Sequence, residues 1–189
     1  MSPGTPVYPD TYRDLSTESL LTVFAAAPHR FRRAVADLGA DELTARPRAG
    51  KWSIQENAIH VADSEVVGAA RVRMVRAEPG ASLPFYAQDV WAREFAYNQA
   101  PASSLEDALR LFEALRASTL PIFRSAAEAD WNKSGLHAEL GPITLRQLLE
   151  LYADHGEWHL WRILQLREML GRPLDMPLLL ERRLFAVTP

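Results

Sequence analysis

Three of the five histidines stand where imidazole groups could share one metal ion. His155 and His159 are four residues apart in a segment with helical periodicity, so both rings leave the helix on one face, about 40° apart. The same face carries an apolar stripe made by Leu148, Tyr152, Ile163, Leu166 and Leu170. A helix buries such a stripe, and two imidazoles in an apolar interior need polar partners. A divalent cation would satisfy both rings at once.

His60 is the best candidate for a third ligand, because it lies on a different predicted helix. On that helix Asn57, His60, Ser64 and Arg71 share one face. A polar strip on a buried helix is typical of a helix that lines a pocket. Three protein ligands and an open position for water or substrate are typical of a catalytic metal site, whereas structural zinc sites are closed.

The residue types only partly limit which metal binds and which side chains surround it. Imidazole suits zinc, nickel, copper and iron; we expect zinc or nickel, with iron and manganese left open. Four polar side chains are candidates to contact the substrate or to support the metal ligands: Asn57, Ser64, Tyr152 and Arg162. The catalytic residue is left unassigned, because Asp63 and Glu65 are poor candidates for a general base.

These residues also allow other interpretations. The paired histidines superficially match the zinc protease motif H-E-x-x-H, but Gly156 holds its second position and Glu157 lies about 200° round the helix from His155. The histidines could also share hydrogen bonds without a metal. We interpret His137 as a structural or surface residue. The run of Arg71, Arg73 and Arg76 is typical of a solvated face, with Arg71 as the exception that a pocket would create.

Composition excludes several classes of protein. The 189 residues, 48% apolar and 24% charged, are enough for one ordinary globular domain. The net charge of −3 provides no basic field for nucleic acid or anionic membrane. Without cysteine, disulfides and thiolate metal sites are impossible. A signal peptide and a membrane span are also missing from the pattern, so we expect a cytoplasmic protein that acts on a small molecule.

Apolar periodicity and helix-start signals predict four long helices. The first begins near Ser16, is kinked or broken at Pro28 and stops before Gly39. Capping boxes at Ser53 and Thr144 begin the second and fourth helices, which run to about residues 78 and 170. The third helix begins at a cap-like Ser104, and Pro121 should bend it.

The remaining segments complete the predicted architecture. A shorter helix is expected over residues 88–98, residues 131–141 are expected to be a loop, and no alternating pattern predicts a sheet. We therefore predict an all-α four-helix bundle with one additional short helix. Its domains are an extended segment over residues 1–16, one bundle over residues 17–171 and an apolar tail over residues 172–189. The tail is expected to pack on the bundle or on a partner subunit.

Several blocks of the sequence resemble the DinB/YfiT-like family. These blocks are Gly50-Lys-Trp-Ser-Ile-Gln-Glu56, His60-Val-Ala-Asp-Ser-Glu65, the stretch from Trp131 through His137 to Gly141 and Thr144, and His155-x-x-x-His159-Leu-x-x-Ile163. The resemblance covers most of the chain, from about Leu20 to Gly171. It implies a four-helix bundle with a divalent metal held by one histidine of the second helix and two of the last. These histidines correspond to His60, His155 and His159.

The resemblance implies an activity in outline. Some members of the family are thiol S-transferases or isomerases that use mycothiol or bacillithiol, others are metal-dependent hydrolases, and many are dimers. We therefore expect a metal-dependent enzyme, with a non-catalytic, stress-related protein that binds a metal or small ligand as the alternative. Two positions depart from the family pattern: Gly156 stands where Asp is common, and Arg162 where Gln is common. Arg162 would place a permanent cation near the metal.

Overall fold

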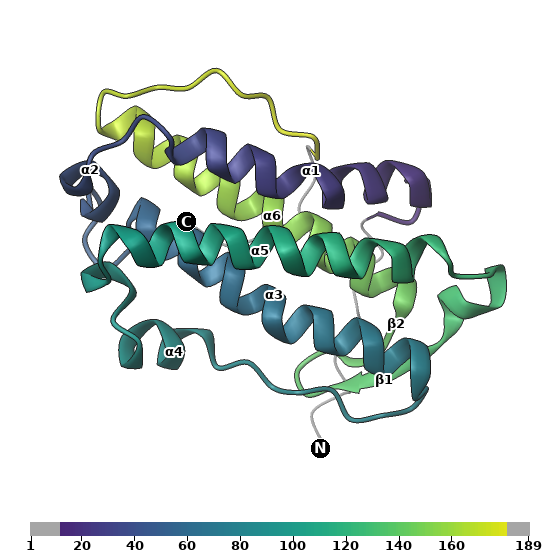
Figure 1. Ribbon diagram of the computed structural model, residues 1–189. Helices are drawn as coiled ribbons and strands as arrows, with labels where there is room; N and C mark the ends of the chain where they lie inside the picture. The colour runs from purple at the N-terminus through teal and green to yellow at the C-terminus, as the bar shows by residue number, and fades with distance from the viewer. Residues whose placement is uncertain (1–11, 181–189) are drawn as a thin grey trace, which may run out of the picture.

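Four long helices form the body of the protein. The computed structural model describes residues 12–180, and within them the long helices are α1 (Thr17–Val35), α3 (Ile54–Ala77), α5 (Ala102–Arg124) and α6 (Leu145–Met169) (Figure 1). Both α1 and α3 pack against α5 and α6, so the four surround one shared interior. The predicted all-α four-helix bundle is confirmed. No helix in the described part of the chain is long and apolar enough to cross a membrane.

Side-chain caps set the start of three of these helices. The hydroxyls of Ser16, Ser53 and Thr144 accept the amides of the third helical residues, and Glu56 completes the box at Ser53 by accepting the Ser53 amide at 2.7 Å. These three predicted starts are confirmed. The predicted start at Ser104 is wrong, because α5 begins two residues earlier, after Pro101. The Ser104 amide already donates to the Pro101 carbonyl at 2.8 Å and needs no cap.

Neither proline breaks its helix. The helix α1 continues through Pro28 to Val35, and α5 continues through Pro121 to Arg124, so the break allowed at Pro28 does not occur. Gly39, expected to stop the first helix, is instead the N-cap of a short helix, α2 (Ala40–Thr44), which the sequence analysis did not predict.

The predicted short helix is present, but it is divided. The helix α4 (Gln88–Glu94) is followed by one 3-10 turn, η1 (Tyr97–Gln99). A left-handed Ala96, with a φ of 48°, separates the two. This geometry is costly for a residue with a side chain and ends the regular helix.

The predictions of no sheet and of a loop over residues 131–141 are wrong. A second 3-10 turn, η2 (Glu128–Asn132), leads into an antiparallel pair, β1 (Ser134–His137) with β2 (Gly141–Thr144). Burial does alternate along β1, with Gly135 and His137 inside and Leu136 outside. Four residues are too few for that alternation to stand out in the sequence. The hairpin lies at the end of the bundle where α6 begins (Figure 1).

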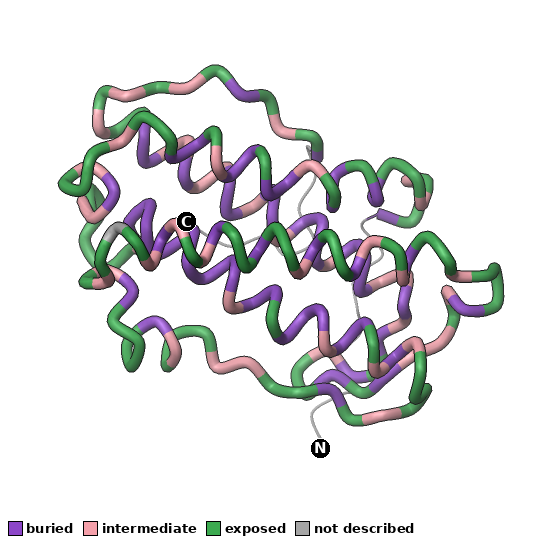
Figure 2. Tube along the Cα trace, viewed as in Figure 1, coloured by how far each residue is buried: buried purple, intermediate pink, exposed green. Residues whose placement is uncertain are grey.

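The apolar interior is divided into two clusters along the bundle. One includes Phe31, Ile54, Phe112, Leu160 and Ile163, and the other includes Phe24, Val72, Phe123, Leu148 and Leu149. Buried positions line the inner faces of the helices over their whole length (Figure 2). Along α5 and α6 the buried charges Arg116 and Glu157 fall between the segments that contribute to the two clusters. A polar layer therefore crosses the middle of the bundle.

The chain after α6 returns along α1, as the last segment in Figure 1 shows. Met176 and Leu180 are buried there. The Leu179 amide donates to Glu157 at 2.6 Å, and Arg30 donates to the Pro177 carbonyl. Most of the predicted extended segment, residues 1–11, and the end of the predicted tail, residues 181–189, lie outside the described residues. The proposed domain boundaries therefore stay predictions.

Candidate metal centre

The bundle brings the three predicted imidazoles together in the polar layer. His60 comes from α3, and His155 and His159 come from α6. One ring nitrogen of each lies within 4.8 Å of those of the other two. The Nε2 atoms of His60 and His155 are 3.0 Å apart. Three nitrogens this close, from two helices, can converge on one cation.

Two neighbouring polar groups orient the rings. Asn57 donates through Nδ2 to the Ser53 carbonyl at 2.7 Å, which fixes its amide so that Oδ1 faces His159. The Nδ1–H of His159 donates to that Oδ1 at 2.8 Å, leaving its Nε2 with a free lone pair. On His60, Nδ1 lies 3.0 Å from the Tyr86 hydroxyl, so Nε2 again faces inward.

All three rings are held in the neutral form that metal ligation requires. Burial is the main cause in each case, because an apolar interior disfavours the imidazolium. Burial and His155 lower the pKa of His60, and burial, His155, His60 and Arg162 lower the pKa of His159. Burial and the cations Arg116 and Arg71 lower the pKa of His155 to about 3.

An unpartnered nitrogen shows that hydrogen bonds do not fully satisfy this cluster. The Nδ1 of His155 is one of the few buried side-chain atoms among residues 12–180 without a hydrogen-bond partner. The Nε2 atoms of His60 and His155 face each other. Without a metal, one of these nitrogens must carry a proton and donate it to the other. A divalent cation between the rings would bind the free Nε2 lone pair of His159 and replace the contact between the Nε2 atoms of His60 and His155. The residues present therefore fit a metal ion.

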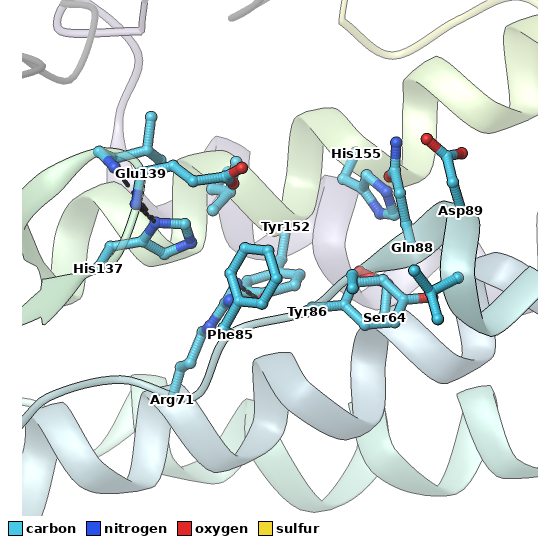
Figure 3. Close-up of a pocket in the computed structure, with 14 residues that line it drawn as sticks. Ser64, Arg71, Phe85, Tyr86, Gln88, Asp89, His137, Glu139, Tyr152 and His155 are labelled. Atoms are coloured by element: carbon cyan, nitrogen blue, oxygen red, sulfur yellow. Dashed lines mark hydrogen bonds between the residues drawn. The ribbon is translucent and has the colours of Figure 1, made fainter.

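A cavity of about 540 Å³ opens beside His155 (Figure 3). Its buried wall includes Arg71 and Tyr152, with the Arg71 Nη1 donating to the Tyr152 hydroxyl at 3.1 Å. Phe85, Leu140 and Leu151 supply apolar surface. The cavity therefore joins one buried cation, an apolar lining and the histidine cluster.

A second cavity, of about 460 Å³, reaches the histidines from another side. Its lining is aromatic and charged: Lys51, Trp52, Asp154, Trp158 and Arg162, with His155 and His159. Trp52 packs on the cluster, its ring centroid 4.7 Å from that of His60. The two cavities share Gln88, Asp89, Leu151 and His155. Asp89 is the carboxylate that lines both of them.

The four other predicted site residues all lie near the histidines, in different places. Asn57 contacts His159, Ser64 and Tyr152 line the first cavity, and Arg162 lines the second. The positive charge of Arg162 is one cause of the lowered pKa of His159, so the cation does lie near the cluster.

The carboxylates considered as general bases face elsewhere. Glu65 is ion-paired to Arg116 at 2.9 Å, Asp63 accepts from Tyr97, and Glu157 is paired with Arg30 at 2.7 Å. Tyr86, Gln88 and Asp89 were not predicted as site residues, because they come from a stretch without clear periodicity. His137, interpreted as structural or surface, is buried in the wall of the first cavity, where its Nδ1 accepts the Glu139 and Leu140 amides at 3.2 and 3.3 Å.

Comparison with protein families places the chain among known sequences. The sequence model of a family described as the DinB superfamily matches residues 24–163. A protein of Oceanobacillus iheyensis is 28% identical over 139 residues, covering 74% of this chain and 78% of the relative. One of Bacillus mycoides is 29% identical over 146 residues, covering 76% and 81%. Both relatives are provisionally named metal-dependent hydrolases.

Solved structures share the fold. One is YfiT from Bacillus subtilis, described as a probable metal-dependent hydrolase with an unusual four-helix bundle topology, with a TM-score of 0.76 and 22% identity over 84% of this chain and 91% of that one. Another is a mycothiol-dependent maleylpyruvate isomerase, with a TM-score of 0.63 and 18% identity over 81% of this chain and 62% of the other. At these identities the likeness extends to the fold.

Proposed function

Because the chain belongs to the DinB superfamily, we propose that it is a metal-dependent enzyme whose cation is held by His60, His155 and His159. One observation carries the proposal. Three neutral imidazole rings from two helices converge to within 4.8 Å at the point where two cavities meet. A cluster with a purely structural role would need neither the two cavities nor a free lone pair on Nε2 of His159.

The metal would supply one kind of chemistry. A divalent ion with three imidazole ligands and an open position acts as a Lewis acid and lowers the pKa of a water or thiol group brought to it. Zinc or nickel suits these ligands, and iron or manganese is the alternative. The protein keeps the rings neutral by burial, and Asn57 and Tyr86 hold their inward orientation.

The two cavities favour a reaction between two organic molecules. A hydrolase needs one cavity for its substrate, because the second reactant is water. Here two adjoining cavities of about 540 and 460 Å³, which share four lining residues, leave room beside His155 for both an electrophile and a low-molecular-weight thiol, such as mycothiol or bacillithiol. We therefore favour thiol S-transfer over hydrolysis.

The transfer can be written with the residues that line both cavities. The thiol loses its proton, its sulfur forms a bond to the electrophilic carbon, and the leaving group departs with the bonding electron pair. Asp89 lines both cavities and is placed to accept the thiol proton. Trp52 and Tyr86 pack on His60 and exclude water from its ring.

Two other functions compete with this one. The names of the relatives favour hydrolysis at the same centre. A non-catalytic metal or small-ligand binding protein would use the same three histidines without turnover. A homodimer, a cytoplasmic location and the absence of nucleic-acid and membrane partners belong to the proposal as predictions of the sequence and of the family resemblance.

The test is turnover by protein loaded with zinc or nickel. The chain would be assayed with 1-chloro-2,4-dinitrobenzene with and without cysteamine, and separately with p-nitrophenyl acetate. We expect metal-dependent conjugation that requires the thiol. Faster ester hydrolysis without conjugation would favour the hydrolase.

Two variants complete this test. His155→Ala should abolish both metal binding and turnover, whereas His29→Ala, an exposed histidine on α1, should change neither. Metal binding without turnover of either substrate class would favour the binding protein. Activity unchanged in His155→Ala would overturn the proposed centre.

A further inference from the structure

Arg71 differs from the other buried arginines of this protein. Within residues 12–180 four arginines are buried: Arg30, Arg71, Arg116 and Arg167. Three of them are ion-paired to a carboxylate, at 2.7 Å for Arg30, 2.9 Å for Arg116 and 2.7 Å for Arg167. Arg71 has no carboxylate partner in the same part of the chain. A buried guanidinium without a counter-ion is costly, so its place in a cavity wall needs an explanation.

The hydrogen bonds of Arg71 leave some of its N–H groups without an acceptor. Its Nε and Nη2 donate to the Pro84 carbonyl at 3.1 and 2.7 Å, and its Nη1 donates to the Tyr152 hydroxyl at 3.1 Å. A guanidinium has five N–H donors, so two have no acceptor in the described part of the chain. The three bonds hold the group rigidly, in the way that a site for a planar anion requires.

The cavity places this cation between the histidines and an apolar wall. In Figure 3 Arg71 lies between His137 on one side and His155 on the other. Burial is the main cause of the lowered pKa of both histidines, and the charge of Arg71 is a further cause for each. Phe85 and Tyr152 lie beside it. The carboxylates of the cavity, Asp89 and Glu139, belong to exposed residues, and neither is paired with Arg71. Arg71 is the one arginine or lysine among the residues that line this cavity, so the lining can neutralise one negative charge, which suits a monoanion.

We propose that Arg71 binds the carboxylate of an organic monoanion in the first cavity. The apolar part of that molecule lies against Phe85, Leu140 and Leu151, and its far end reaches towards His155. This inference names the substrate class of the proposed enzyme and so rests on the proposed function for its role in turnover. The anion site itself does not require the metal, because its cation is a side chain.

Benzoate and its neutral analogue benzamide test the site on the metal-free protein. Ligand titrations followed by NMR should show binding of benzoate at least about tenfold tighter than that of benzamide. Arg71→Gln should remove this preference. Arg73→Gln is the matched control, because it makes the same charge change two residues away on the exposed side of α3, and it should keep the preference.

Each outcome decides the proposal. Arg71→Lys keeps the charge without the planar fork and should retain part of the preference, which covers the case in which Arg71→Gln does not fold. Equal binding of benzoate and benzamide by the unsubstituted protein would overturn the site. So would benzoate binding that appears only after zinc is added, because the carboxylate would then be on the metal. If the unsubstituted protein binds benzoate but binds neither zinc nor nickel, this inference is upheld and the proposed metal centre is overturned.

Discussion

Two polar clusters occupy the interior of the bundle, and they differ in whether the protein satisfies their atoms. The first joins Arg116 of α5 to Glu65 of α3, and the second is the histidine cluster. Both lie between the apolar ends of the core, and both bury groups that water would otherwise solvate.

The Arg116 cluster is closed. Its Nε donates to Glu65 at 2.9 Å, its Nη1 to the Phe24 carbonyl at 2.9 Å and its Nη2 to the Tyr152 carbonyl at 2.7 Å. Its guanidinium carbon lies 3.9 Å from the centre of the Phe24 ring. Each of its three nitrogens donates one hydrogen bond and Glu65 neutralises its charge, so the cluster ties α5 to α1, α3 and α6.

The histidine cluster is open by the same measure. The Nδ1 of His155 has no hydrogen-bond partner in the described chain, and two cavities reach the ring. The bundle therefore neutralises the buried charge of Arg116 but leaves a buried ring nitrogen of His155 without a hydrogen-bond partner. The difference supports the proposal that the first cluster stabilises the bundle and that the second binds a metal ion.

Breaking the closed cluster should have the largest effect on folding. Arg116→Met leaves Glu65 buried without a counter-ion, and we expect a loss of about 3–5 kcal/mol in the free energy of unfolding. Urea denaturation measures it. Arg110→Met, an exposed position on the same helix, should stay within about 0.5 kcal/mol of the unsubstituted protein.

A double variant sharpens the same comparison. Arg116→Met with Glu65→Leu removes both charges, so it should recover most of the stability that the single variant loses. A double variant as unstable as Arg116→Met would show that the packing of the Arg116 side chain, and not its ion pair, is what the bundle needs.

Loosening the open cluster should act on metal binding first. Asn57→Ala removes the acceptor that orients His159, and we expect zinc affinity to fall by about 10–100-fold. Competition with a chromogenic chelator measures the affinity. Thr44→Ala is the control, because Thr44 is a half-buried residue of α2 that lines neither cavity. An unchanged affinity in Asn57→Ala would contradict the role of Asn57 as the group that orients His159.

The sequence was sufficient to predict the helices that hold these clusters and the helix faces that point inward. His155 and His159 could be paired because the helical period alone places them on one face. His60 could be added because Asn57 and Ser64 mark the same face of its helix. The starts at Ser53 and Thr144 were predictable because a capping box is a local pattern of hydrogen bonds.

Contacts between distant segments were beyond such local patterns. The Glu65–Arg116 pair joins residues 51 positions apart, although a cation one turn beyond Phe112 on an apolar stripe was a visible signal. Tyr86 reaches His60 from a stretch whose path depends on Arg71 holding the Pro84 carbonyl. Arg71 was named as the exception to a run of arginines expected on a solvated face, and it is buried, but its bonds to Pro84 and Tyr152 come from distant segments that no local pattern predicts.

Acid should destabilise the metal-free protein through the open cluster. Burial lowers the pKa of His60, His155 and His159, so below about pH 6.5 the unfolded chain binds protons that the folded one does not. The free energy of unfolding should therefore decrease as the pH decreases, by up to about 1.4 kcal/mol per pH unit for each histidine. For His155 the loss continues until its folded pKa of about 3.

Chemical denaturation between about pH 7 and pH 5.5 measures this slope, above the range in which most carboxylates titrate. His155→Ala should give a shallower slope than the unsubstituted protein, and His29→Ala, exposed on α1, an unchanged one. Equal slopes for the unsubstituted protein and His155→Ala would mean that His155 is protonated as easily in the folded chain as in the unfolded one.

The smallest effect is expected at the edge of the open cluster, where Tyr86 orients His60. Tyr86→Phe removes one hydrogen bond to Nδ1 but keeps the ring, whose centroid lies 5.7 Å from that of His60. The bond is present without metal, so its loss should lower the free energy of unfolding of the metal-free protein by about 0.5–1.5 kcal/mol. Zinc affinity should weaken by no more than the equivalent factor, about 12-fold, because the His60 ring is less firmly oriented. The chelator competition used for Asn57→Ala measures the affinity on the same scale. A loss in Tyr86→Phe larger than that in Asn57→Ala would reverse the order of the two supports and make the partner of His60 the stronger one.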